Sequence, residues 1–156
     1  MYQKGDSIVY PLYGAGVIEG IEDKEIDGEL QTYYVLNIPV GNLKIMISAA
    51  KAEGQKVRLV HSSDEILVLV SNAKQTTMPD NWNQRYKENM ERIKSGDITE
   101  VAVVFYNLLL RERERGLSTA EKKMMTTAKQ IILSEIILSL GVDKNEAEEI
   151  LDKTFG

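Results

Sequence analysis

The stretch MPDNWNQRYK, residues 78–87, is where the chain changes from a β-rich half to a helical half. Pro79 cannot continue a preceding element, and Asp80 or Asn81 can cap a helix that begins directly afterwards. Trp82, the only tryptophan of the chain, would therefore lie at the N-terminal end of that helix. Backbone N–H groups at such an end attract anions, so a flat apolar ring beside basic residues is suited here to stacking on nucleic acid.

A buried role for Trp82 is the alternative, and spacing alone favours it. Trp82, Tyr86, Met90 and Ile93 recur at the spacing of one helix face, which is the pattern of a packed core. A tryptophan is also highly buried on average. In that case the indole would be a buried hinge between the two halves, and the chain would be a protein-binding adaptor without DNA contact.

The N-terminal half has the pattern of a small β domain. Runs rich in Val, Ile, Leu and Tyr are separated by turn residues, and Asp27-Gly28 between two runs is a strong hairpin signal. Residues 62–73 favour a short helix, and residues 74–80 have the polar composition of a connector. The strands are expected at residues 7–10, 16–21, 32–38, 43–47 and 56–60, which suffices for a strongly bent, five-stranded barrel.

Beyond residue 80 the hydrophobic period becomes helical. Asp97, Ser118 and Asp143 each stand three residues before a Glu, which is the capping-box arrangement or its Asp variant. A glycine closes each preceding helix. Four helices are expected, at residues 81–95, 97–115, 118–140 and 143–155, and connections this short predict a compact bundle.

Composition excludes several classes of function. The chain of 156 residues is 43% hydrophobic and 28% charged, which is typical of one folded domain or two small ones. It has no cysteine and one histidine, His61, which excludes disulfides, thiolate metal sites and sites with two imidazoles. We expect neither an enzyme nor a cofactor or metal, because the sequence contains no recognisable catalytic nucleophile with its base and no set of metal ligands. Without a bilayer-spanning run or a signal-peptide pattern, we expect a cytoplasmic protein with no membrane partner.

The charge distribution points to one part of the chain. The net charge of −5 argues against strong nucleic-acid binding by the free protein. Residues 74–130 nevertheless carry 11 Lys and Arg against 8 Asp and Glu, whereas the segments on either side are acidic. The candidates for a cationic surface around Trp82 are Arg85, Lys87, Lys122, Lys123 and Lys129.

Four ordered motifs resemble one known family. They are GDxIVYPxxGxG at residues 5–16, NWxxRYK at 81–87, KxGD at 94–97 and ERGLSxxEK at 114–122. Together they resemble the CarD/CdnL family of bacterial transcription regulators over nearly the whole chain. The ordered set is much more specific than any of its members alone.

The resemblance implies a Tudor/SH3-like domain at residues 1–73 that binds the β subunit of RNA polymerase, a linker at 74–80 and a helical domain at 81–156 that contacts promoter DNA. Trp82 matches the residue that wedges into the minor groove at the upstream fork of the transcription bubble in the family. Arg85, Lys87 and Lys122 match positions associated with the DNA backbone, and Lys24 and Met46 match positions that face the polymerase.

Physical reasoning fits this resemblance. An acidic protein with one modest cationic surface holds DNA weakly, but tethering to polymerase raises its effective concentration at the fork. If the strand at residues 43–47 lies at a sheet edge, it could pair with a polymerase strand, and Lys44 and Met46 would set specificity. We therefore expect a monomeric α+β transcription regulator, at the nucleoid through RNA polymerase, that stabilises the open promoter complex.

Overall fold

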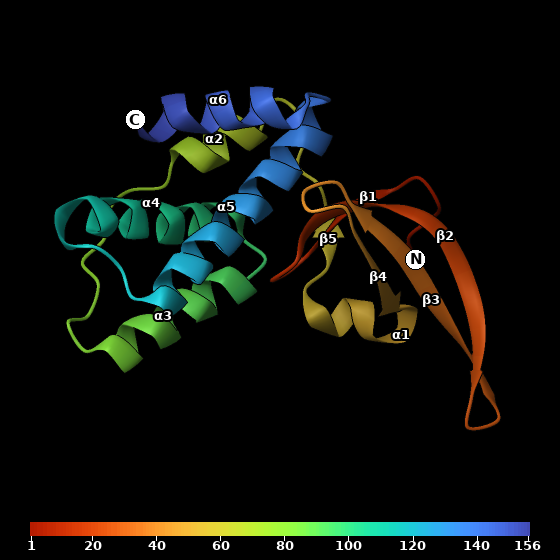
Figure 1. Ribbon diagram of the computed structural model, residues 1–156. Coiled ribbons are helices and arrows are strands. Elements are labelled where there is room, and N and C mark those ends of the chain that lie inside the picture. Colours follow the sequence, from red (N-terminus) through yellow and green to blue (C-terminus); the bar gives the residue numbers. More distant parts are fainter.

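The computed structural model describes residues 1–156, apart from the side chain of Glu53. Its strands are β1 (Ser7–Tyr10), β2 (Gly14–Ile26), β3 (Glu29–Ile38), β4 (Leu43–Ser48) and β5 (Arg58–Leu59). Its α-helices are α1 (Ala49–Ala52), α2 (Ile66–Ser71), α3 (Trp82–Lys94), α4 (Ile98–Arg115), α5 (Thr119–Leu140) and α6 (Lys144–Phe155). The sheet and the larger helices form two adjacent parts of an α+β fold (Figure 1).

The N-terminal sheet is antiparallel throughout, in the order β4-β3-β2-β1-β5. Asp27 and Gly28 join β2 to β3 in a long projecting hairpin (Figure 1), and both have the positive φ that a two-residue type I′ turn requires. The predicted five-stranded, Tudor-like architecture is confirmed. The described strands form an open sheet, however, with β4 and β5 at its two edges.

Three strands differ clearly in length from the sequence pattern, and one of them is β3, which begins at Glu29 instead of residue 32. β2 continues to Ile26 although its residues from Ile21 onward are exposed, because backbone pairing with β3 extends the strand where no apolar alternation marks it. β5 is shorter than predicted and comprises only Arg58 and Leu59. The helical turn before β5 ends at Lys56 in a left-handed conformation, with φ of 58°, which delays the strand.

Helices α3 to α6 confirm the predicted four-helix bundle. Each follows its predicted cap, whose side chain accepts a hydrogen bond from a backbone N–H of the first turn. The four caps are Asn81, Asp97, Ser118 and Asp143. The local sequence therefore sets where these helices begin.

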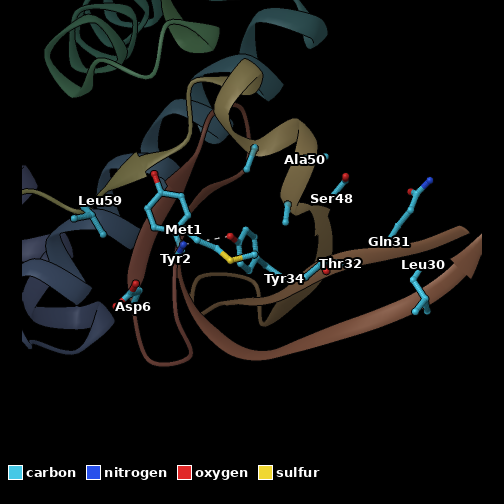
Figure 2. Close-up of a pocket in the computed structure, with 12 residues that line it drawn as sticks. Met1, Tyr2, Asp6, Leu30, Gln31, Thr32, Tyr34, Ser48, Ala50 and Leu59 are labelled. Atoms are coloured by element: carbon cyan, nitrogen blue, oxygen red, sulfur yellow. Dashed lines mark hydrogen bonds between the residues drawn. The ribbon is translucent and has the colours of Figure 1, made fainter.

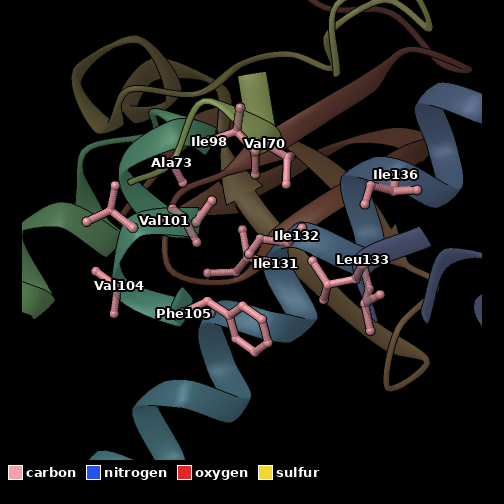
Figure 3. Packing of buried hydrophobic residues seen from close by; sticks show 14 of the residues in the cluster. Val70, Ala73, Ile98, Val101, Val104, Phe105, Ile131, Ile132, Leu133 and Ile136 are labelled. Carbon is pink, nitrogen blue, oxygen red and sulfur yellow. The ribbon is translucent and has the colours of Figure 1, made fainter. Parts of the chain in front are cut away.

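The main apolar core joins α2, α4, α5 and α6. Figure 3 shows Val70 of α2 near Val101 of α4 and Ile132 of α5, all of which are buried in one cluster. The short helix predicted within residues 62–73 is thus present as α2, and its apolar side packs with the helical half of the molecule. A separate, smaller cluster fills the inner face of the sheet.

The two halves meet where α5 crosses β2. The Ser134 hydroxyl, which is fully buried, accepts a hydrogen bond of 2.8 Å from the Ala15 N–H and donates one of 2.7 Å to the Ile131 carbonyl. A Cβ atom on Gly14, whose φ is 119°, would lie only 2.7 Å from Ser134 Oγ. Close backbone approach and a satisfied buried hydroxyl therefore hold α5 against the sheet.

The connector at residues 74–80 lies on the surface of α4. The Asn107 amide, which is buried, accepts a hydrogen bond of 2.9 Å from the Thr76 N–H and donates one of 2.7 Å to Thr76 Oγ1. These two bonds fix the path of the chain into α3.

In the described chain, no single helix meets the length and hydropathy needed to cross a bilayer; α5 and α6 do so only as a pair, bent by 114°.

Candidate functional site

Trp82 is the first residue of α3, and 41% of it is exposed. Asn81 Oδ1 accepts a hydrogen bond of 3.0 Å from the Gln84 N–H and so caps the helix beside it. The indole stacks on the ring of Tyr86, with the centroids 5.2 Å apart and the planes 19° from parallel. Its Nε1–H donates a hydrogen bond of 3.1 Å to Ser118 Oγ, at the N-cap of α5. A large apolar ring is thus partly open to solvent but held on one side by an aromatic partner and at its edge by a hydroxyl.

Arg85 occupies a different place from the one expected of it. Only 3% of the residue is exposed, and its guanidinium points into the helical half. There it forms a two-bond ion pair with Glu121 of α5, with Nε to Oε2 at 2.8 Å and Nη2 to Oε1 at 3.2 Å. Nη1 donates to the carbonyl oxygens of Pro79 and Asp80. Arg85 therefore has no guanidinium surface for a phosphate in this structure, and we remove it from the candidate DNA-contacting residues.

Burial and pairing shift both pKa values of this pair. Hydrogen bonding to Glu121 is the largest influence on Arg85 and raises its pKa above the ordinary value of an arginine. For Glu121, burial is the largest single influence and acts to raise the pKa. The hydrogen bonds from Arg85 and Ser118, with the charge of Arg85, outweigh burial, so the pKa of Glu121 is lowered from 4.5. Both residues are therefore charged at neutral pH.

The lysines of the candidate surface are not equivalent. Lys87 is exposed on α3, and Lys122 and Lys123 are exposed on the first turns of α5, where both line a shallow hollow with Thr119. Lys123 also lines a small cavity with Tyr86, the stacking partner of Trp82. Lys129 is half-buried further along α5 and lines another cavity, next to the C-terminal helix. The structure thus places Lys123 at the same cavity as Tyr86 and Lys129 at a different one.

The other candidate residues lie on the sheet. Lys24, Lys44 and Met46 are all exposed, and Lys24 Nζ is 3.4 Å from Met46 Sδ. Lys44 forms an exposed ion pair of 3.4 Å with Glu19. Lys44 and Met46 belong to β4, which pairs with β3 on one side and is an edge strand on the other. The strand at residues 43–47 therefore lies at a sheet edge, which is the condition under which it could pair with a partner strand.

A large cavity of about 750 Å³ also lies in the sheet half, between the N-terminal residues, β3 and α1. Figure 2 shows Met1, Tyr2 and Tyr34 at this cavity, with Leu30 and Gln31 of the hairpin further out. The Tyr2 N–H donates a hydrogen bond of 3.2 Å to the Tyr34 hydroxyl. The sequence pattern did not mark this cavity, because its lining comes from segments that only the fold brings together.

Three residues that support Trp82 were also missed as site residues: Tyr86, Ser118 and Glu121. The sequence places Ser118 and Glu121 in a helix-start motif and Tyr86 in an apolar stripe, and all three in the motifs shared with the family, but these patterns assign none of them a role beside Trp82. A usable signal existed, since Glu121 lies three residues before Met124 and seven before Ala128, on the apolar face of its own helix. An acidic residue on such a face predicts a buried cationic partner.

Comparisons with known proteins bear on both halves. Residues 2–61 match the model of the CarD-like/TRCF RID domain, and residues 66–152 match that of the CarD C-terminal domain. The chain belongs to the CarD family. It is also 37% identical, over an alignment of 161 residues that covers all of both chains, to the "Putative transcription factor YdeB" of Bacillus subtilis (strain 168). The resemblance inferred from the motifs is confirmed, and family membership supports a role for this CarD-family protein in the regulation of transcription.

Proposed function

We propose that this protein binds the β subunit of RNA polymerase through its N-terminal sheet and stabilises the open promoter complex through Trp82. The observation that carries the proposal is the state of the indole: it is 41% exposed at a helix N-terminus, yet it is held by Tyr86 and Ser118. A pre-positioned, accessible aromatic ring loses little freedom when a base stacks on it.

The surroundings of Trp82 support the same proposal. Lys87, Lys122 and Lys123 are exposed on the two helices that carry the ring and its hydroxyl partner. Their positive charge suits contact with the phosphate backbone, although the whole chain has a net charge of −5. Such a surface binds DNA weakly by itself. A second contact that holds the protein near the DNA raises its effective concentration there, so the weak contact is sufficient.

The edge strand β4 is the proposed tether. An edge strand offers unpaired backbone groups to a partner strand, and its exposed Lys44 and Met46 side chains, with Lys24 nearby, can select the partner. The match of residues 2–61 to the CarD-like/TRCF RID domain supports a polymerase partner for this half. The adaptor alternative required a buried indole between the halves. The ring instead stacks on Tyr86 and donates a hydrogen bond to Ser118, and both residues belong to the helical half.

The lifetime of the open promoter complex tests the role of Trp82. Trp82→Ala should shorten this lifetime by about ten- to a hundredfold at most, the range that corresponds to loss of one base-stacking contact. Capture of the protein by the isolated polymerase β lobe should not change. Val68→Ala, which removes an exposed apolar side chain from α2, is the matched control. Equal lifetimes for Trp82→Ala and the parent would refute the proposed stacking contact.

Capture by the β lobe tests the tether separately. Met46→Glu should weaken capture, because it places a carboxylate at the centre of the proposed strand contact, next to Lys24. Leu67→Glu, at a position of α2 whose side chain is partly exposed, changes charge equally and should leave capture unchanged. Unaltered capture of Met46→Glu would place the polymerase contact elsewhere than β4.

A further inference from the structure

A continuous set of hydrogen bonds joins Trp82 to the buried ion pair. Its indole N–H donates to Ser118 Oγ at 3.1 Å, and the Ser118 hydroxyl donates to Glu121 Oε1 at 3.0 Å. Ser118 Oγ also accepts the Glu121 N–H at 3.2 Å, so its one proton and both lone pairs are used. Glu121 in turn accepts two hydrogen bonds from Arg85. The edge of the ring is therefore connected, bond by bond, to the Arg85 guanidinium.

The same guanidinium also holds the backbone next to the ring. Arg85 Nη1 donates hydrogen bonds of 3.2 Å to the Pro79 carbonyl and 3.0 Å to the Asp80 carbonyl. These are the last residues of the connector, immediately before the cap and Trp82. The ion pair thus acts on Trp82 from two directions, through the chain that enters α3 and through Ser118 at the start of α5.

The pair is well suited to hold a fixed geometry. Arg85 is 3% exposed and Glu121 is 2% exposed, so water competes little for either group. A guanidinium that bonds a carboxylate through two of its nitrogens is fixed in orientation as well as distance. Loss of either partner would leave the other charge buried without its counterion.

We propose that Arg85 and Glu121 are positioning residues for Trp82. They touch no DNA; they hold the indole at the angle and height at which a base can stack on it, with Ser118 as the link. Only the expected effect on DNA contact rests on the proposed function. The mobility of the indole can be measured in the free protein, without DNA. Preorganisation of this kind lowers the entropic cost of binding.

Fluorescence of the free protein tests the positioning step, since Trp82 is the only tryptophan. Ser118→Ala removes the acceptor of the indole N–H but neither member of the Arg85–Glu121 pair. It should increase the fast component of the time-resolved anisotropy and the rate of acrylamide quenching. Ser118→Thr restores a hydroxyl and should rescue both. Glu121→Gln and Arg85→Lys should loosen the ring in the same way, with folding verified by circular dichroism.

Loss of a helix cap needs its own control. Asp143 caps α6, because its Oδ1 accepts a hydrogen bond from the Glu146 N–H. Asp143→Ala therefore lowers the stability of that helix but removes none of the hydrogen bonds between Trp82 and Arg85. The order of the indole in Asp143→Ala should match that of the parent. If Ser118→Ala and Glu121→Gln leave the indole as ordered as in the parent, or if Asp143→Ala loosens it equally, the proposal is overturned.

Open-complex lifetime tests the consequence. Ser118→Ala and Glu121→Gln should shorten it by about two- to tenfold, the range that corresponds to ordering one side chain. In a Trp82→Ala background they should have no further effect. An ordinary loss of stability would instead add to Trp82→Ala and would contradict the proposal. Should Trp82→Ala itself leave the lifetime unchanged, the proposed DNA contact fails, while the fluorescence result still decides whether the pair positions the ring.

Discussion

Glu135 of α5 accepts two hydrogen bonds of 2.8 Å from the Arg58 guanidinium of β5. Its Oε2 also accepts the His61 N–H at 2.9 Å, and Glu135 is fully buried. Arg58 further donates to the Gly96 carbonyl at 2.7 Å. One carboxylate within the buried stretch 131–136 of α5 therefore joins the sheet edge, the segment after it and the bundle. Together with the Ser134 contact to Ala15, this junction connects the sheet to the helical half, which carries Trp82 on α3.

Glu135→Ala should lower the free energy of unfolding by about 3 kcal/mol, because it leaves the Arg58 guanidinium without its carboxylate. We place the value at the low end for a broken buried pair, since 23% of the Arg58 side chain is exposed. Urea denaturation at neutral pH measures the change. Glu100→Ala, which breaks the partly exposed 3.3 Å pair with Arg92, is the control and should cost less than about 1 kcal/mol. Equal losses for the two variants would contradict a special role of the junction.

Gly14→Ala should destabilise the protein by about 1–3 kcal/mol, because the new Cβ would lie 2.7 Å from Ser134 Oγ and φ is 119°. Thermal denaturation gives the difference. Gly20→Ala provides the comparison, because its Cβ would meet nothing within 4 Å, and it should be near neutral. A neutral Gly14→Ala would mean that α5 can move away from β2 at little cost.

The contribution of Glu121 should depend on pH with a definite sign. Its pKa is lowered in the folded protein, so the folded state favours the charged carboxylate and the Glu121 contribution is complete above the ordinary value of 4.5. As the pH falls below 4.5 towards the lowered pKa, this contribution disappears. The stability difference between the parent and Glu121→Gln, measured by urea denaturation, should therefore be largest at neutral pH and shrink in acid. A difference independent of pH would show that the charge of Glu121 is not responsible.

Neutralising the exposed lysines should change the salt dependence of the DNA contribution. Lys87→Gln, Lys122→Gln and Lys123→Gln should each reduce the slope of log affinity against log salt by about 1 for one lost phosphate contact. Lys129→Gln, which alters a half-buried residue at another cavity, should change the slope less. The slope is measured from the DNA-dependent affinity of the protein for the polymerase–promoter complex over a series of salt concentrations. If Lys129→Gln has the largest effect, the DNA path lies along α5 instead of around Trp82.

Much of the fold could be predicted because its signals are local. A cap such as Ser118 or Asp143 bonds a backbone N–H three residues away, and the Asp27-Gly28 turn needs only its own two φ angles. The position of Trp82 at the start of α3 follows from the same local chemistry. The sequence alone therefore determined the order of the five strands and of the helices α2 to α6, the starts of the four long helices, and the family, but not the short helix α1.

Tertiary structure decided which charged residues belong to the interior. Arg85 has the same spacing from Trp82 whether it faces a phosphate or the core, and only the packing of α3 on α5 brings it to Glu121, 36 residues away. Glu135 likewise meets Arg58 across 77 residues. Periodicity specifies a face of a helix but not what that face meets, because the partner is chosen by long-range packing. The sequence placed the indole, and the folded core determined what holds it.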